Sequence, residues 1–270
     1  MKRVESILPA GKKWELVWSD EFEGNELDRS KWDFRLHMMQ RRHPALVEDE
    51  GVSLNGDSSL LFHLVQKNGE YYSTQLQTGE NFMDRPQNDN YDAYGEFRWP
   101  IAKHATPKFM KKYGYFECRC RFQKQPGWWS AFWLQSPIIG ASADPGQSGV
   151  EIDIMENFKR SGEYLHNAFW GGYGRSMGAG HSGPRFFEPE HVNDWHIFAV
   201  DWNPDGYIFY VDGKESWRFN EVVSHTEQFI MLSAECEHYR LHGHATDELK
   251  QVHVPDCFEV DFVRVYDAVK

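Results

Sequence analysis

The chain has 270 residues, a formal net charge of −12 at pH 7 and an aromatic content of 16%. Acidic residues are spread along the whole chain, which argues against nucleic acid or an anionic membrane as the main partner, and no apolar stretch is long enough to span a bilayer. Tryptophan, tyrosine and phenylalanine exceed what the core of such a chain requires, so we expect some aromatic faces to be available to a ligand.

Strand patterns follow one another along the chain, and no window shows helical spacing of apolar residues over several turns. An Asn-Gly-Asp turn at 55–57 lies between the segments 52–54 and 60–65, and Asp212-Gly213 joins 207–211 to 214–219. Both patterns predict β-hairpins. Further strands are predicted at 113–122, 130–135, 151–157, 165–170, 196–202, 229–235 and 258–266.

Four long stretches lack a regular pattern, namely 33–50, 81–109, 136–149 and 171–193. Long loops on a rigid sheet structure usually line a binding surface. The same aromatic-rich strand pattern lies on both sides of each stretch, so we predict a single domain over residues 1–270. Many short antiparallel strands without internal repeats predict an all-β fold, a two-sheet antiparallel β-sandwich.

The four cysteines are too few to hold together a domain of this size. Cys118 and Cys120 lie two positions apart on the same face of a predicted strand, which disfavours a bond between them. We expect free, partly buried thiols, with a bridge between Cys236 and Cys257 as the alternative.

One basic cluster, Arg41-Arg42-His43, stands out in this acidic chain. Such a cluster is usually part of a solvated loop, and the alternative is contact with an anionic group on a substrate. Residues 1–13 lack the apolar core of a signal peptide. A signal that has been removed would leave the same pattern, so no compartment follows from it.

Three carboxylates, Glu151, Asp153 and Glu156, occur within six residues of one predicted strand. In a regular strand Glu151 and Asp153 share a face, whereas Glu156 points to the other side. A β-bulge at Ile154-Met155 would return Glu156 to the face of the other two. We therefore predict a bulged strand whose three acidic side chains face outward together.

Such a trio suggests a specific chemistry. Two glutamates that flank a glycosidic bond can perform retaining hydrolysis, one attacking the anomeric carbon and the other protonating the departing oxygen. Repulsion among three neighbouring anions raises at least one pKa, and the group that stays protonated is the natural general acid. Asp153, between the two glutamates, can hold the nucleophile and the shared proton in place. The alternative is a solvated acidic face on an amphipathic strand.

The tryptophans of the preceding segment point to a sugar site. In residues 126–134 the alternation places Trp129, Ala131 and Trp133 on one face. If that face carries the carboxylates, the small Ala131 leaves room for a sugar ring between two indoles. The alternative is that both tryptophans pack in the core.

Together these segments resemble glycoside hydrolase family 16, the family of laminarinases, lichenases, agarases and carrageenases. The resemblance covers nearly the whole chain and rests on residues 18–22, 113–119, 129–133, 149–157, 201–213 and 260–266. The bulged spacing is the one associated with the laminarinase, agarase and carrageenase branches. The resemblance implies a concanavalin-like jelly roll with an open cleft on its concave sheet, in an extracellular or periplasmic enzyme.

By this resemblance Glu151 is the nucleophile, Asp153 the assisting acid and Glu156 the general acid/base. His166 stands where relatives direct a histidine at the carboxylates, with a satisfied polar core histidine as the alternative. Trp170 shares the face of His166 and would stack on a sugar.

Two further expectations concern a second cleft strand and a metal. Glu235 would accept hydrogen bonds from sugar hydroxyls, or else be a surface carboxylate. Relatives often bind a structural calcium on the convex side near the positions of Glu21 and Asp261, although two carboxylates are fewer than the six or more oxygens that calcium requires. The chemistry itself requires no cofactor.

The main hypothesis is a retaining endo-hydrolase of β-1,3-glucan or a β-linked galactan, acting as a monomer on a polysaccharide. The alternatives are a carbohydrate-binding protein without turnover, and a transglycosylase that passes the same intermediate to a sugar hydroxyl. A binding module would have no need for three crowded acids whose repulsion costs stability.

Overall fold

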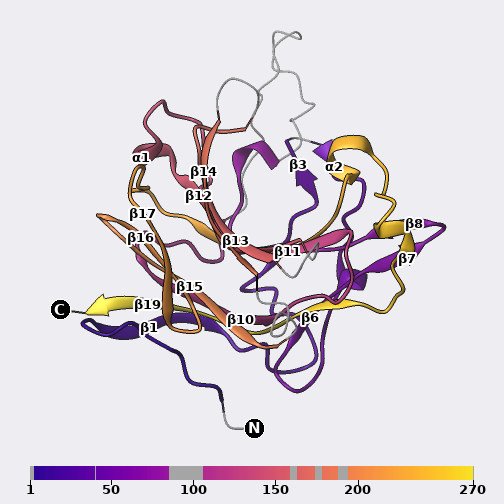
Figure 1. Cartoon of the computed structure of the whole chain (residues 1–270), viewed down its shortest axis with the longest axis horizontal. Helices are drawn as coiled ribbons and strands as arrows, with labels where there is room; N and C mark the ends of the chain where they lie inside the picture. The colour runs from indigo at the N-terminus through magenta and orange to yellow at the C-terminus, as the bar shows by residue number, and fades with distance from the viewer. Residues whose placement is uncertain are drawn as a thin grey trace.

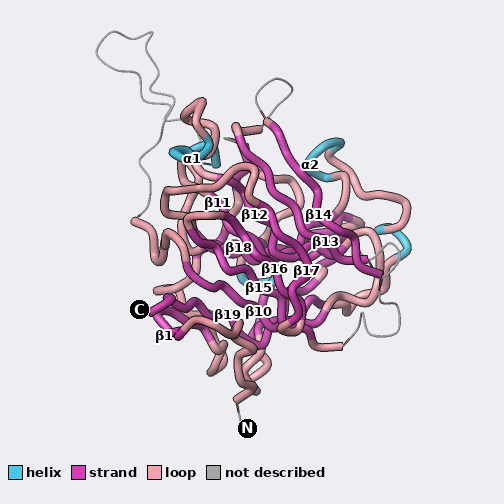
Figure 2. The backbone as a smooth tube through the Cα atoms, turned by 60° about the vertical axis from the view of Figure 1, so that its left-hand side comes forward, coloured by secondary structure: helices cyan, strands magenta, loops and turns pink. Residues whose placement is uncertain are grey.

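The computed structural model describes residues 3–39, 41–84, 106–158, 163–173, 178–187 and 194–269. Two large antiparallel sheets lie one above the other (Figure 1), and the helices between their strands are few and short (Figure 2). The predicted two-sheet antiparallel β-sandwich is confirmed. Within the described residues, no helix is both long and apolar enough to cross a membrane.

The lower layer in Figure 1 is an eight-stranded sheet with the order β17-β16-β15-β10-β19-β6-β5, and β1 pairs with β19. Its strands are β1 (Lys13–Asp20), β5 (Val52–Leu54), β6 (Leu60–His63), β10 (Gly114–Arg121), β15 (His196–Asn203), β16 (Gly206–Val211), β17 (Lys214–Phe219) and β19 (Cys257–Val269). Asp212 and Gly213 have φ angles of 49° and 76° and join β16 to β17, as expected for a tight hairpin. The hairpin predicted around Gly56 is also present, between β5 and β6.

The upper layer is a seven-stranded sheet with the order β14-β13-β12-β11-β18-β9-β2. Its strands are β2 (Asp33–Phe34), β9 (Gln75–Gln77), β11 (Trp128–Gln135), β12 (Val150–Asn157), β13 (Glu163–Trp170), β14 (Ala179–Phe187) and β18 (Phe229–Cys236). The carboxylate strand, β12, lies between β11 and β13. Both neighbours therefore fix its register.

The remaining elements are short and belong to the connections. They are β3 (His37–Met38), β4 (Arg41–Arg42), β7 (Val65–Lys67), β8 (Glu70–Tyr72), the helices α1 (Pro145–Ser148) and α2 (Tyr239–His242), and the 3-10 turns at Asp49–Gly51, Phe82–Asp84 and Leu249–Gln251. β3 and α2 matter most here, because residues of both segments line the cleft described below.

The core lies between the two sheets and takes apolar side chains from both, for example Phe132 and Ile152 from one sheet and Phe198 and Val263 from the other. Strand alternation accounts for this, since every second residue of a strand faces the same way. All four cysteines are free thiols. The expected free state is confirmed, and the alternative bridge between Cys236 and Cys257 is not formed.

One strand, β14, lies inside a stretch predicted to be irregular. It is the edge strand of its sheet, it contains Gly180, Gly183 and Pro184, and its described side chains are exposed or half-buried. An edge strand needs no apolar alternation, and it tolerates proline because one side of its ladder has no partner. The usual strand pattern was therefore absent from its sequence.

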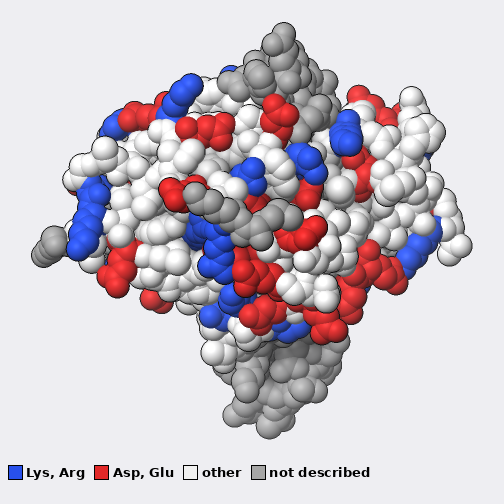
Figure 3. Space-filling model, turned by 90° about the horizontal axis from the view of Figure 1, so that it is seen from below, with Lys and Arg blue, Asp and Glu red and all other residues white. Residues whose placement is uncertain are grey.

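Acidic and basic side chains lie next to one another across the outer face of the eight-stranded sheet (Figure 3). Ion pairs on this sheet include Arg119 with Asp261, at 2.6 Å. Arg264 holds Glu21 through two hydrogen bonds, from Nε to Oε1 at 2.8 Å and from Nη2 to Oε2 at 2.7 Å. The two carboxylates expected near a calcium ion thus each have an arginine partner.

Candidate active site

The β-bulge predicted at Ile154-Met155 is present. Against β11, Met155 pairs with Phe132 and Asp153 pairs with Trp133, so Ile154 is the extra residue. The register of β12 against β13 shifts in the same interval. Ile154 and Met155 are both fully buried in the core, which two consecutive residues of a regular strand could not be.

The bulge brings Glu151, Asp153 and Glu156 to one face, where all three line a cleft of about 670 Å³. β11, β13, β18 and α2 supply much of the wall. The cleft is also lined by Arg35, Trp129, Trp133, Phe158, Asn167, Tyr173, Glu235 and Arg240. The alternative of a solvated acidic face is wrong, because Asp153 is only 4% exposed.

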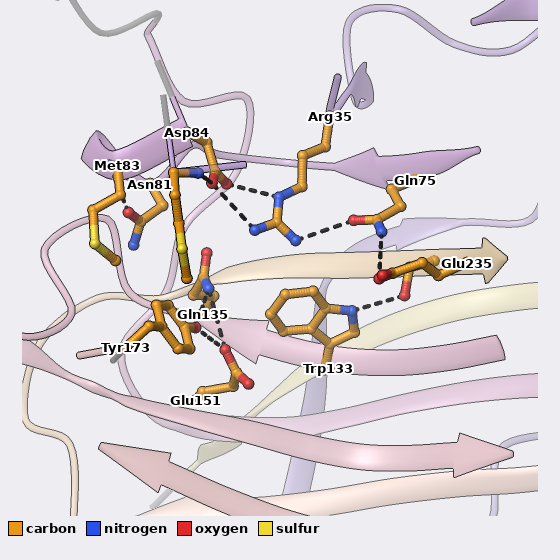
Figure 4. A network of polar contacts seen from close by, with 12 residues as sticks. Arg35, Gln75, Asn81, Met83, Asp84, Trp133, Gln135, Glu151, Tyr173 and Glu235 are labelled. Carbon is orange, nitrogen blue, oxygen red and sulfur yellow. Dashed lines mark hydrogen bonds and ion pairs between the residues drawn. The ribbon is translucent and has the colours of Figure 1, made fainter. Parts of the chain in front are cut away.

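Glu151 is held by two donors on the same oxygen. Tyr173 donates its hydroxyl to Oε2, and Gln135 donates Nε2–H to the same atom at 3.2 Å (Figure 4). Burial raises the pKa of Glu151, while the bonds from Tyr173 and Gln135 and the charge of Arg35 oppose that rise. These donors favour the carboxylate form, which is the form a nucleophile requires.

Glu156 has a different environment. It accepts one hydrogen bond, from Asn167 Nδ2 to Oε2 at 2.6 Å. Burial raises the pKa of Glu156 to about 7, and the nearby Glu151 charge adds to the effect while the Asn167 bond opposes it. A carboxylic acid with such a pKa can both give and take a proton near neutrality.

Asp153 lies between the two glutamates and is the most strongly perturbed of the three. Burial, followed by the charges of Glu156 and Glu151, raises the pKa of Asp153 well above its usual range. Asp153 is buried, and Glu151 and Glu156 are half-buried. Repulsion among three neighbouring carboxyl groups disfavours the state in which all of them are ionised. The pKa of each of the three is raised, and Glu151 differs in having two hydrogen-bond donors and the Arg35 charge to oppose that rise.

A buried polar network lies beside the carboxylates (Figure 4). Arg35 donates to both oxygens of Asp84, at 2.7 and 3.2 Å, and to Gln75, which in turn donates to Glu235. The Arg35 guanidinium lies 5.4 Å from the ring centroid of Trp133. A charged residue thus covers part of this indole.

Trp133 and Trp129 therefore differ in what they present to the cleft. Trp133 is 8% exposed, donates its N–H to Ser233 and belongs to a small apolar cluster with Met231. Trp129 is half-buried and stacks on Phe158 at a centroid distance of 5.4 Å, and Arg240 lies 5.8 Å from its ring. Both tryptophans line the cleft, and Trp129 offers the larger surface.

The expectation that His166 and Trp170 face the carboxylates is wrong. Both point into the sandwich: His166 is fully buried, and Trp170 packs against the core and stacks on Phe219. The register places Asn167 and Phe169 on the cleft side of β13 instead. Successive residues of a strand point to opposite faces. The prediction that His166 faces the cleft therefore assigned every residue of β13 to the wrong face.

Glu235 lies in the cleft, 4% exposed, so the alternative of a surface carboxylate is wrong. Besides the bond from Gln75, Arg240 Nε lies 3.3 Å from its Oε1. His43 Nε2 is 3.6 Å from the same oxygen. Although burial acts in the opposite direction, the nearby His43 and the Arg240 charge leave the pKa of Glu235 lowered.

The basic cluster of the sequence is divided by the fold. Arg41 and Arg42 are exposed on β4, whereas His43 is buried beside Glu235. The two arginines are not among the residues that line the cleft.

The residues expected near a calcium ion do not fit a calcium site. Both oxygens of Glu21 bind Arg264, and Asp261 binds Arg119. Within the part of the chain that the structure describes, no group of three or more histidine, cysteine or acidic side chains could hold a metal ion.

Sequence reasoning missed several side chains that contact the carboxylates. Gln135 and Asn167 follow the alternation of β11 and β13, so the correct strand faces would have identified them. Tyr173 and Arg35 belong to connecting segments, and nothing in their local sequence indicated that they reach Glu151 and its surroundings.

The chain is similar to several known proteins. The family model described as "Glycosyl hydrolases family 16" matches residues 73–234, more than half of the chain. A glucan endo-1,3-beta-glucosidase A1 from Niallia circulans is 26% identical over 276 residues, covering 96% of this chain and 38% of that protein. A keratan-sulfate endo-1,4-beta-galactosidase from Sphingobacterium multivorum is 23% identical over 278 residues, covering 98% of this chain and 58% of the relative.

Among solved structures, the catalytic domain of an endo-1,3-beta-glucanase (laminarinase) from Thermotoga petrophila RKU-1 superposes with a TM-score of 0.67. It is 22% identical and the match covers 96% of this chain and 100% of that one. The sandwich is therefore shared with that structure. The chain spans less than two thirds of the length of the two relatives named above.

Proposed function

Because the chain belongs to glycosyl hydrolases family 16, we propose that it is an endo-acting hydrolase that cuts internal β-linkages of a polysaccharide with retention of configuration. The observation that carries this proposal is the unequal treatment of two glutamates on one bulged strand. Glu151 receives two hydrogen-bond donors, whereas Glu156 has a pKa raised to about 7 by burial. A nucleophile and a proton donor need these two environments.

In the first step Glu151 attacks the anomeric carbon and forms a glycosyl ester. Tyr173 and Gln135 both donate to Oε2, which makes Oε1 the attacking oxygen. Glu156 gives its proton to the glycosidic oxygen as the carbon–oxygen bond breaks. Asp153, whose pKa is raised by burial and by both glutamates, holds a proton between them.

In the second step Glu156, now a carboxylate, removes a proton from water as the water attacks the anomeric carbon. The ester bond breaks, Glu151 returns to its carboxylate form and the sugar leaves with its original configuration. If a sugar hydroxyl replaces water, the same residues perform transglycosylation. Both outcomes use one intermediate.

The substrate we propose is a neutral or substituted β-linked chain, a β-1,3-glucan or a β-linked galactan. The two relatives named above support these classes through their names, one a glucan endo-1,3-beta-glucosidase and the other a galactosidase of keratan sulfate. Trp129 would provide the stacking surface, and Glu235 a hydrogen-bond acceptor for sugar hydroxyls. We propose that the protein acts as a monomer in an extracellular or periplasmic setting.

The second candidate is a carbohydrate-binding protein without turnover. It would use the same cleft and Trp129. The three crowded carboxyl groups favour the enzyme, because a binding surface gains nothing from acids that raise one another's pKa.

The test is product analysis of wild type, Glu151→Gln and the matched control Glu215→Gln on laminarin, mixed-linkage glucan, agarose, porphyran, carrageenan and keratan sulfate. Glu215 is exposed on the other sheet and pairs with Arg218. We expect oligosaccharides from one substrate with wild type and the control, and none with Glu151→Gln. Binding without cleavage by wild type would favour the second candidate.

A further inference from the structure

The buried histidine of β13 contacts the catalytic bulge from the core side. His166 is fully buried, and its ring lies near those of Phe186, Phe209 and Trp217, at centroid distances of 5.4, 4.8 and 6.4 Å. Nδ1 is 2.6 Å from the backbone carbonyl oxygen of Ile154. Nε2 is 2.8 Å from the hydroxyl of Ser216, on the opposite sheet.

These partners determine where the imidazole hydrogen lies. Burial lowers the pKa of His166 to about 4, so the ring is neutral near pH 7 and has one N–H. A carbonyl oxygen can only accept, so Nδ1 must carry the hydrogen and donate it to Ile154. Nε2 then accepts from Ser216. The only donor of the ring is directed at a residue of the bulge.

The register explains why a donor is needed there. Asp153 pairs with Asn167 and Glu156 pairs with Leu165, so His166 is the one residue of β13 opposite both bulge residues. An extra residue disrupts the ladder locally, and a buried carbonyl without a hydrogen bond is costly. The neighbouring pair β13–β14 shifts register at the same place. This part of the sheet thus has irregular pairing on both sides of His166.

We propose that His166 is a positioning residue of the active site, which fixes the catalytic bulge from its buried side by donating Nδ1–H to the carbonyl of Ile154. Through the bulge it sets the separation between Glu151 and Glu156 on the opposite face of the strand. This inference rests on the proposed function of those two glutamates. Small displacements of catalytic groups are costly, since a shift of about 1 Å can reduce the rate by about 100-fold.

The experiment compares two polar replacements of similar size. In His166→Asn the side-chain amide nitrogen takes the place of Nδ1 and keeps the bond to Ile154. In His166→Gln the amide lies further out, where it reaches Ser216 instead. Ser216→Ala removes only the second bond and is the matched control. Thermal melts establish that each variant is folded.

Two readouts are measured. The first is kcat and KM on the polysaccharide that wild type cleaves, and the second is carboxyl ¹³C NMR titration of Glu156, assigned with Glu156→Gln, which needs no turnover. We expect His166→Asn and Ser216→Ala to retain kcat and the titration near pH 7. His166→Gln should lose about 100-fold in kcat at unchanged KM, and its Glu156 carboxyl should titrate at lower pH as the glutamates separate.

The proposal is overturned if His166→Gln keeps the wild-type kcat and titration, or if His166→Asn loses as much as His166→Gln. Should His166→Gln not fold, the other two variants decide, because both keep the bond to Ile154 and a loss of kcat in either contradicts the proposal. If no polysaccharide is cleaved by wild type, the proposed function fails, and the NMR titration still tests the role of His166.

Discussion

Replacing Asn167 with leucine should move the alkaline limb of the pH–rate profile upward. Asn167 donates to Glu156 at 2.6 Å, and this bond opposes the rise in the pKa of Glu156 to about 7 that burial causes. Leucine has a similar size, offers no donor and admits no water. A hydrogen bond to a charged group contributes about 1.5–3 kcal/mol, and 1.36 kcal/mol corresponds to one pKa unit, so the limb should rise by about one to two units.

The assay is kcat/KM across pH 4 to 10, whose limbs report the carboxyl groups of the free enzyme. Tyr173→Phe is the matched comparison: it removes a donor from Glu151, so it should raise the acidic limb and leave the alkaline limb in place. An alkaline limb that stays at the wild-type pH in Asn167→Leu, or moves to lower pH, would refute the assignment of Glu156 as the proton donor stabilised by Asn167.

Three further predictions concern stability and binding. Burial and both glutamates raise the pKa of Asp153 in the folded protein. The stability linked to this group is therefore fully present below its unfolded pKa of about 3.9. That stability is lost as the pH rises through the pKa of the folded state. The melting temperature should therefore fall more between pH 4 and pH 8 in wild type than in Asp153→Asn, and equal slopes in differential scanning calorimetry would contradict this. Trp129→Ala, made in the inactive Glu151→Gln protein, should weaken polysaccharide binding in affinity electrophoresis with little change in melting temperature. If the mobility shift is unchanged, Trp129 is not the surface on which the sugar stacks. Trp133→Ala should lower the free energy of unfolding by about 3–5 kcal/mol in urea titrations, because its ring is 8% exposed and packed, whereas a loss near zero would place it on the surface of the cleft.

The bulged strand could be predicted from the sequence because its residues leave few alternatives. Glu151, Asp153 and Glu156 cannot share a face without an extra residue, and Ile154-Met155 supplies two apolar side chains for the core. The hairpin at Asp212-Gly213 was equally well determined, since its residues favour the positive φ angles of the turn. In both cases local chemistry fixes local structure.

The faces of β13 could not be determined in the same way. The segment from Leu165 to Trp170 alternates without a clear polar side, so local pattern does not say whether His166 or Asn167 faces the cleft. The register that decides it comes from pairing with β12 across the bulge. Tyr173 illustrates a second limit: its contact with Glu151 depends on the path of a connecting segment, which no alternation describes.

The bulge determines which side chains β12 places in the core and which it places in the cleft. On the core side it lets Ile154 and Met155 be buried together, and it presents a carbonyl to His166. On the cleft side it returns Glu156 to the face of Glu151. A regular strand with a glutamate two positions after Asp153 would also place three acids on one face. Only one residue would then lie between Asp153 and that glutamate, so one side chain would enter the core there, whereas the bulge buries both Ile154 and Met155. The extra residue therefore links the packing of the core to the spacing of the acids, and for this reason a change made on the buried side, at His166, should be measurable at Glu156.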